Sequence, residues 1–535
     1  MSDSMSTDIG LVPDRTTPLE RSRRRWSLGC IFIVQALHGV AFYAMSSSLM
    51  AIAKTHLKFS NTAAVGTSLA FSACVYVMPS VGGTVGDIQL GRYKTIFYGI
   101  ALYLLGTVLS LILVVLLNVS KTTPIDVLPM RIVYICSLIL VAVSRGFIKT
   151  NIIPFGAQQV DQSKSFHITS YFRWSIWFFN IGKFCAYCPL AFFVLNVGIT
   201  DGLLIQAIVQ VVTVGLSVAV FILGKGKYTV SHHVSPPSTG TASIKYLWEV
   251  VRSSLSCFKK RQPWDDDTSW TESAETVTKE EKAITRIVFK KICFMLGIFA
   301  SIGVFETLYF QMTSTYIMQG KSLRHDMEIL PKQLMNAFAP CVVLVGVPLT
   351  EFVSRKYWSR ERRKYKFTEL MQMGSGTIFA ALSVLCAGII ESAIRTGWDV
   401  NVFWQMPQFT LMGMADLLVF IPGFEFCYRE SMAGLASFTT GLFFAVGSLF
   451  GFIIFLAFIP LGTIQVGEQL NEKYFEYLFY VLFGLMVVVL LVIFLPLSHW
   501  YTGLRRELLN KEQERARGME VTIQQVRPQD EGGES

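Results

Sequence analysis

The chain has 535 residues, of which 52% are hydrophobic and 16% are charged. Soluble proteins carry about 25% charged residues to cover their surface, so this composition excludes an ordinary soluble domain and indicates a surface that faces lipid. The net charge of +10 does not indicate nucleic acid binding, because the basic residues lie in short loops between apolar runs and in the tails, where they act as topology signals.

The N-terminal segment does not have the pattern of a cleavable signal. It is polar and then basic over Arg21–Arg25, and the apolar run behind it is longer than the core of a signal peptide. Asp14–Leu19 loosely resembles an acidic dileucine sorting signal, although Pro18 takes the place of one leucine. The plasma membrane and an endolysosomal membrane therefore both stay open as the location.

Twelve apolar runs follow, each long enough for a spanning helix of about 20 residues. They begin near Trp26, Ala63, Thr95, Ile132, Tyr171, Gly202, Lys291, Leu334, Gly374, Val402, Gly434 and Tyr474. We expect an all-α integral membrane protein with a cytosolic tail (1–25), a six-helix bundle (26–223), a cytosolic linker (224–286), a second six-helix bundle (287–502) and a disordered cytosolic tail (503–535). This layout is typical of the major-facilitator fold, whose substrate site lies near the midplane between the halves.

The placement of lysine and arginine predicts the orientation. Basic residues gather in the N-terminal tail, the Gly91–Lys94 turn, the linker and the C-terminal tail, and the loop Arg355–Lys366 holds seven of them against one glutamate. If the spans alternate, all of these lie on one side, so both termini are expected in the cytosol. An opposite loop carries the sequon Asn118-Val119-Ser120, which predicts a glycan at Asn118 on the outer or lumenal side.

Within the linker, apolar residues recur at helical spacing, at Ile244, Leu247, Trp248, Val251, Leu255 and Phe258. The pattern predicts a helix that packs under the bundle or lies on the membrane surface.

Ten cysteines give no disulfide framework, since most lie inside apolar runs, where cysteine behaves as a small hydrophobic residue. Cys185 and Cys188 form a CxxC inside a predicted span, but no second pair lies near them in the sequence. We expect no metal and no cofactor other than a coupling proton. The sequence has no nucleophile-and-base set or phosphate loop, so an enzyme is not expected.

Three stretches of the first half carry distinctive motifs: residues 82–96 read GGTVGDIQLGRYKTI, residues 145–159 read RGFIKTNIIPFGAQQ and residues 171–182 read YFRWSIWFFNIG. Glycine lets two helices approach closely. Asp87 can pair with a cation or cap a helix start, and Arg92 is a basic residue of the same turn. These residues would hold one conformation of a rocking bundle.

The second half adds residues 309–320 (YFQMTSTYIMQG), 333–337 (QLMNA), 348–351 (PLTE), 404–408 (WQMPQ) and 421–428 (IPGFEFCY). In this order the motifs of both halves closely resemble those of the proton-coupled oligopeptide transporter family, and the peptide/histidine branch in particular. The resemblance implies a bilayer protein that moves small peptides or histidine by alternating access, with protons as the coupling ion.

Ionisable side chains are costly inside a bilayer, so each one is a candidate functional residue. By resemblance, Lys149 lines the cavity and contacts the peptide carboxylate, while Glu425 takes part in gating and holds the substrate amine. A structural ion pair is the alternative for Glu425. Asp416, about two and a half turns earlier, is grouped with the proton-coupling or gating residues and could equally be a structural partner. Glu351 is grouped with the gating residues. The remaining cavity positions implied by the resemblance are Asn180, Asn336, Gln311, Tyr43, Tyr309 and Trp404.

The first span departs from the family pattern. The family motif ExxERFxYYG carries two glutamates and an arginine for proton handling, whereas residues 35–44 here read QALHGVAFYA. His38 is the titratable residue that remains, and its ordinary pKa of about 6.5 would suit an acidic compartment. A satisfied core histidine is the alternative.

Charge is gained elsewhere, at Arg145, Lys183 and Glu306, where the family is usually uncharged. Arg145 lies one turn before Lys149 and shares its helix face. We expect Lys183 or Arg145 to pair with Glu306 or Glu425, replacing the lost charge of the first span.

Two functions stay open on the sequence. The first is a secondary transporter of di- or tripeptides or histidine. The second is a family member that transports weakly or not at all and acts as an endolysosomal scaffold or sensor with a cytosolic adaptor protein. Retention of Lys149, Asn180 and Glu425 favours transport, and the loss of the span 1 acids favours the scaffold.

Overall fold

The computed structural model describes residues 18–120, 126–161, 165–228 apart from residue 198, 279–358 apart from residues 314, 322 and 325–331, 368–458 apart from residue 433, and 473–508, together with residues 245, 248, 252 and 510. Within these ranges the regular structure is helical, apart from one isolated bridge between Arg324 and Asn401. The predicted all-α membrane fold is confirmed. Eleven described helices are long and apolar enough to cross a membrane, and a shorter apolar helix covers Ala436–Gly451.

The first half contains α1 (Pro18–Ala51), α2 (Asn61–Thr84), α3 (Arg92–Val119), α4 (Val127–Ala157), α5 (Ser165–Cys185) and α7 (Ile199–Leu223). A π turn, η1 (Ile52–His56), ends α1, and a second, η2 (Val85–Gln89), ends α2. A third, η3 (Ala186–Leu190), joins α5 to the short α6 (Ala191–Val197).

The second half contains α9 (Lys279–Phe310), α11 (Phe338–Trp358), α12 (Glu369–Arg395), α13 (Met406–Glu430), α14 (Ala436–Phe458) and α15 (Lys473–Val488). Shorter elements lie between them: η4 (Gln311–Thr313), α10 (Thr315–Lys321), η5 (Lys332–Ala337) and η6 (Val402–Gln405). The last helix continues through the π segment η8 (Val489–Phe494) to residue 508.

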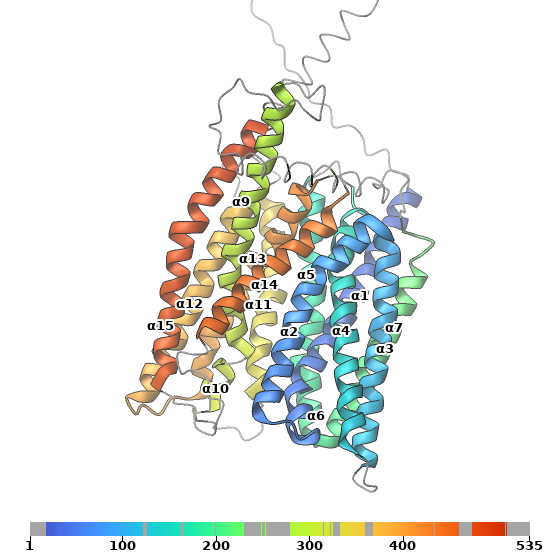
Figure 1. Cartoon of the computed structure of the whole chain (residues 1–535), viewed down its shortest axis with the longest axis vertical. Coiled ribbons are helices and arrows are strands. Elements are labelled where there is room, and N and C mark those ends of the chain that lie inside the picture. The colour runs from blue at the N-terminus through green and yellow to red at the C-terminus, as the bar shows by residue number, and fades with distance from the viewer. Residues whose placement is uncertain are drawn as a thin grey trace, which may run out of the picture.

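The helices of each half pack mainly against one another, and the halves meet through α2 against α14 and α5 against α11 (Figure 1). An aromatic cluster on α3, α4 and α7 stabilises the first half, where Tyr93 stacks on Phe221 at 5.1 Å between ring centroids. A second cluster stabilises the other half, where Phe299 and Phe443 meet edge to face at 5.2 Å. Such pairs add about 0.5–1.5 kcal/mol each beyond the area they bury.

Adjacent glycines of the predicted Gly-rich turn let α2 touch two helices. A Cβ added at Gly82 would meet the backbone of Gly146 in α4, and one added at Gly83 would meet the backbone of Ser437 in α14. Because these contacts are with backbone atoms, they cannot move away as a side chain would. Gly83 therefore sets the approach between the halves.

Two predicted boundaries differ from the structure. Residues 18–25 are helical and continue α1, because Arg23 Nε donates to the carbonyl of Lys227 at 3.1 Å. Residues 503–508 continue the last helix and do not belong to a disordered tail, because Arg505 Nε lies 2.9 Å from a carboxylate oxygen of Glu430.

Several expectations lie outside the described residues. They are the sorting signal, most of the linker with its amphipathic pattern, the basic loop beyond residue 358 and the tail beyond residue 510.

Candidate functional site

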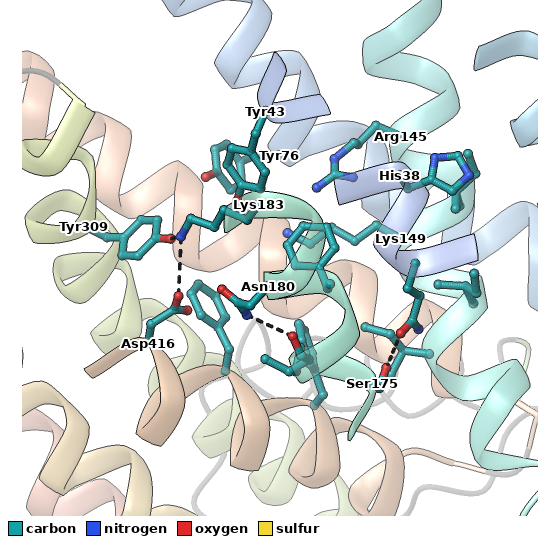
Figure 2. A pocket seen from close by; sticks show the side chains of 18 residues that line it. His38, Tyr43, Tyr76, Arg145, Lys149, Ser175, Asn180, Lys183, Tyr309 and Asp416 are labelled. Atoms are coloured by element: carbon teal, nitrogen blue, oxygen red, sulfur yellow. Dashed lines mark hydrogen bonds and ion pairs between the residues drawn. The ribbon is translucent and has the colours of Figure 1, made fainter. Parts of the chain in front are cut away.

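A pocket opens between the halves (Figure 2). Helices α1, α2, α4 and α5 line it from the first half, and α9 and α13 line it from the second. The lining residues are Gln35, His38, Tyr43, Tyr76, Arg145, Ile148, Lys149, Ile152, Ile153, Ser175, Ile176, Phe179, Asn180, Lys183, Tyr309, Asp416, Phe420 and Phe424.

An ion pair crosses the pocket from one half to the other. Lys183 of α5 places its Nζ 3.6 Å from Oδ2 of Asp416 in α13, and both side chains are almost fully buried. Lys183 also donates to the hydroxyl of Tyr309 in α9 (Figure 2). Because a buried charge without its partner is costly, these contacts hold the two walls of the pocket together.

Two further cations lie on the α4 wall and face aromatic rings. The guanidinium of Arg145 lies 3.9 Å from the ring centroid of Phe42 and 5.2 Å from that of Phe179. Nζ of Lys149 lies 3.6 Å from the centroid of Phe444. Among the described residues, neither cation has a carboxylate within ion-pair distance. Cation–π contacts of this kind are each worth about 0.5–2 kcal/mol.

The α1 and α5 side of the pocket is polar but carries no acid in the described chain. Ser175 donates to Oε1 of Gln35 at 2.8 Å, and the amide of Asn180 donates to the carbonyl of Ile176 at 2.9 Å. His38 stacks on Tyr103 with 5.1 Å between centroids, and its Nε2 is buried without a hydrogen-bond partner in the described part of the chain. The position of the span 1 acids is thus taken by an amide and a stacked imidazole.

Asp87 closes one end of the boundary between the halves, the end that we predict to be cytosolic. Its carboxylate pairs with Arg92 at 2.8 Å and accepts from the backbone N–H of Phe438 at 2.8 Å. Arg92 also donates to the hydroxyl of Ser437 at 2.9 Å. Asp87 of the first half therefore caps the start of α14 in the second half. The N-terminus of a helix favours a negatively charged group such as this carboxylate.

Glu351 forms a second contact at the same end. Arg173 of α5 lies 3.1 Å from Glu351 of α11, and Ser170 donates to the same carboxylate at 2.7 Å.

Glu425 of α13 forms a third contact between the halves at this end. It pairs with Arg429 at 2.6 Å and accepts from Thr169 of α5 at 2.5 Å. Together with the Asp87 and Glu351 contacts, it joins the halves at the predicted cytosolic end.

Not every residue expected in the cavity lies there. Gln311 and Asn336 are buried in other parts of the second half, and Trp404 is 65% exposed in η6, just before α13. Glu306 is 2% exposed, but it does not line the pocket and its Oε2 has no hydrogen-bond partner among the described residues. Asn118 is half-buried in the last turn of α3.

The expected pairing of Lys183 or Arg145 with Glu306 or Glu425 is wrong. Lys183 pairs with Asp416, and Arg145 has no carboxylate at ion-pair distance among the described residues. Helix geometry gives the reason for Glu425. Nine residues at about 1.5 Å each place Glu425 about 13.5 Å further along α13, where it meets Thr169 of α5 and not Lys183.

Sequence reasoning missed Tyr76, Phe420 and Phe424 as lining residues. A signal was present for two of them, because Asp416, Phe420 and Phe424 recur at intervals of four and so share a helix face. Tyr76 had no such signal, since a single tyrosine in an apolar span is usually core or interface.

The fold and the pocket define a membrane protein of two helical halves with a charged binding pocket between them. No group of three or more potential metal ligands occurs in the part of the chain that the structure describes. The family model of the POT family matches residues 93–473. The chain belongs to the POT family; it is a membrane transporter by family and not an enzyme.

Relatives and solved structures agree with this. The chain is 26% identical to Protein NRT1/PTR FAMILY 8.5 of Arabidopsis thaliana, over 88% of this chain and 89% of the relative. It is 23% identical to Solute carrier family 15 member 3 of Rattus norvegicus, over 91% and 93%. Its fold is similar to the crystal structure of the POT family transporter PepTSo, with a TM-score of 0.66, 20% identity, and 89% of this chain and 98% of that chain covered.

Proposed function

We propose that the protein moves di- or tripeptides, or histidine, across a membrane by alternating access, with the pocket between the halves as the substrate site. The observation that carries this proposal is the separation of charge across the pocket. Arg145, Lys149 and Lys183 lie on the first half, and Asp416 lies on the second. A zwitterion can place its carboxylate at Lys149 and its amine at Asp416, and so draw the two halves together.

Proton coupling in this account passes through Asp416. The described part of α1 supplies no acid to the pocket, so the carboxylates left are Asp416 in its wall and Glu306 buried nearby. A proton on Asp416 removes its charge and releases Lys183, so the pocket opens more easily when protonated. This moves the coupling step from the first span to the boundary between α5 and α13.

Alternating access requires the halves to separate at one end at a time. In the structure, three polar contacts close the predicted cytosolic end, those of Asp87, Glu351 and Glu425. The closed end corresponds to a state in which substrate enters from the opposite side. We assign Glu425 to this gate and not to the substrate amine.

The orientation, the membrane and a cytosolic adaptor remain proposals from the sequence. Both termini are placed in the cytosol because the basic loops share one side. Glycosylation of Asn118 would then occur on the outer or lumenal side.

Uptake into proteoliposomes tests the function. Purified protein is reconstituted, and entry of labelled dipeptide and of labelled histidine is measured with and without an inward proton gradient. We expect saturable uptake of at least one of them, and faster uptake with the gradient. No uptake under either condition would contradict the transporter proposal and favour a scaffold or sensor.

A further inference from the structure

The pocket has a surplus of buried positive charge. Three cationic side chains line it, Arg145, Lys149 and Lys183, and one carboxylate, Asp416, lines it opposite them. Glu306 is buried in α9, three residues before the lining residue Tyr309, but it does not line the pocket itself. Even with both carboxylates ionised, one cation of the three is left without a matching charge.

Arg145 and Lys149 form no ion pair with the described residues, and they lie together. They are four residues apart on α4, so their Cβ atoms are about 5–6 Å apart on one helix face. Figure 2 shows both side chains extending from α4 toward the middle of the pocket. Two like charges at this spacing repel each other, and an anion between them relieves the repulsion.

Arg145 has hydrogen-bonding capacity left over. It is 5% exposed, its charge faces the rings of Phe42 and Phe179, and its Nε has no hydrogen-bond partner among the described residues. A guanidinium is always charged, and its N–H groups can donate two parallel hydrogen bonds to a carboxylate. The aromatic rings beside Arg145 do not accept such a pair of hydrogen bonds.

Unused polar atoms elsewhere in the lining also favour an acceptor-rich ligand. Within the described residues, Gln35 Nε2 is a buried donor without a partner, and His38 Nε2 is a buried nitrogen without one. Both residues line the pocket. An unmet buried donor costs about 1–3 kcal/mol, so a ligand with carboxylate oxygens gains by meeting it.

We propose that the pocket selects substrates with a net negative charge, and that Arg145, beside Lys149, binds a second carboxylate such as an acidic side chain of a peptide. This inference rests on the proposed transport function and names its substrate class. A neutral zwitterion brings one carboxylate to Lys149 and one amine to Asp416, and so leaves Arg145 without a matching charge. An acidic dipeptide supplies one further negative charge and matches it.

A binding panel tests the proposal without requiring transport. Alanyl-alanine, alanyl-glutamate, alanyl-lysine and succinate are titrated against the full chain in detergent by calorimetry. A charge-assisted carboxylate contact of about 1.5–3 kcal/mol predicts that alanyl-glutamate binds at least about tenfold more tightly than alanyl-alanine. Alanyl-lysine should bind most weakly.

Variants assign the effect to Arg145. In Arg145→Gln the ratio of the two affinities should fall to near one, and Arg145→Lys should restore part of it. Arg131→Gln is the matched control: Arg131 is also on α4, but it donates to the carbonyl of Leu57 at 3.1 Å and lies outside the pocket. Because the ratio is taken within one preparation, a loss of folded protein does not change it.

The outcomes separate this proposal from the transport function. Equal binding of alanyl-alanine and alanyl-glutamate, or an unchanged ratio in Arg145→Gln, overturns the acidic preference and leaves peptide transport standing. Binding of succinate alone supports the anion site and contradicts a peptide substrate. No binding of any of the four overturns the acidic preference, and the uptake assay then decides the transport function.

Discussion

Lys183 and Asp416 face each other across the boundary between the halves, with 3.6 Å between Nζ and Oδ2. One residue comes from α5 and the other from α13, and both are buried. Removing one partner of a buried ion pair is costly, because the remaining charge is left unpaired in a medium with little water. The pair therefore stabilises the closed pocket, and a substrate or proton that replaces one partner can release it.

Loss of Lys183 alone should be strongly destabilising. In Lys183→Met the carboxylate of Asp416 is left unpaired, which costs about 3–5 kcal/mol. Thermal unfolding of the purified protein in detergent measures the effect as a lower transition temperature. The double variant Lys183→Met with Asp416→Leu should recover most of the stability, because both charges are gone.

The double variant should nevertheless lose proton-stimulated uptake, since Asp416 can no longer carry the proton. Full stability in Lys183→Met, or proton-stimulated uptake in the double variant, would contradict the role given to this pair.

Removal of the carboxylate at Asp87 should open the predicted cytosolic end. Asp87→Ala loses the cap on α14, worth about 1 kcal/mol, together with a buried contact to Arg92. Pulsed EPR distances between spin labels on exposed positions at the ends of α2 and α13 should show a larger open fraction. Asp399→Ala is the control, because its ion pair with Arg324 is exposed and such pairs are worth about 0–1 kcal/mol. Equal opening in the two variants would count against the gate.

Replacing each of two glycines of α2 by alanine should have opposite effects on the stability of the protein. Gly83→Ala places a Cβ against the backbone of Ser437, and such overpacking costs about 1–3 kcal/mol. Gly66→Ala, on the same helix, meets no atom within 4 Å and should gain up to about 1 kcal/mol of helix propensity. Unfolding in detergent compares the two, and a neutral Gly83→Ala would show that α2 and α14 do not need this close approach.

The substrate amine should depend on Asp416 and not on Glu425. In the unaltered protein, N-acetylation of a dipeptide should weaken binding by about 1.5–3 kcal/mol, the value of a hydrogen bond to a charged group. That loss should persist in Glu425→Gln and disappear in Asp416→Asn, measured as a double-mutant cycle with the two ligands. The reverse pattern would return the amine site to Glu425.

The helices were predictable because the length of an apolar run alone identifies a membrane span. Each predicted run lies in a described helix, from Trp26 in α1 to Tyr474 in α15. The capping role of Asp87 could also be predicted, since an acidic residue beside a helix boundary commonly pairs with a cation or caps a helix start. Its partner Phe438 was not, because only the docking of α2 on α14 brings them together.

The charged pocket was predictable in part. Lys149, Asn180 and Tyr309 came from motifs, and Lys183 stood out as a charge in an apolar span. Its partner could not be chosen, because three acids of the second half were candidates and the sequence does not give the angle at which the halves meet. The spacing of Asp416 and Glu425 would have separated those two, since nine helical residues place them about 13.5 Å apart along α13.

The central claim is that substrate binds at Lys149 between the halves. The most direct test compares dipeptide binding by calorimetry in Lys149→Gln and in Lys94→Gln, since Lys94 is exposed in the first turn of α3. Loss of a charge-assisted carboxylate contact of about 1.5–3 kcal/mol predicts that Lys149→Gln binds at least tenfold more weakly, while Lys94→Gln binds as the unaltered protein does. Equal binding by both variants, with both folded, would contradict the site.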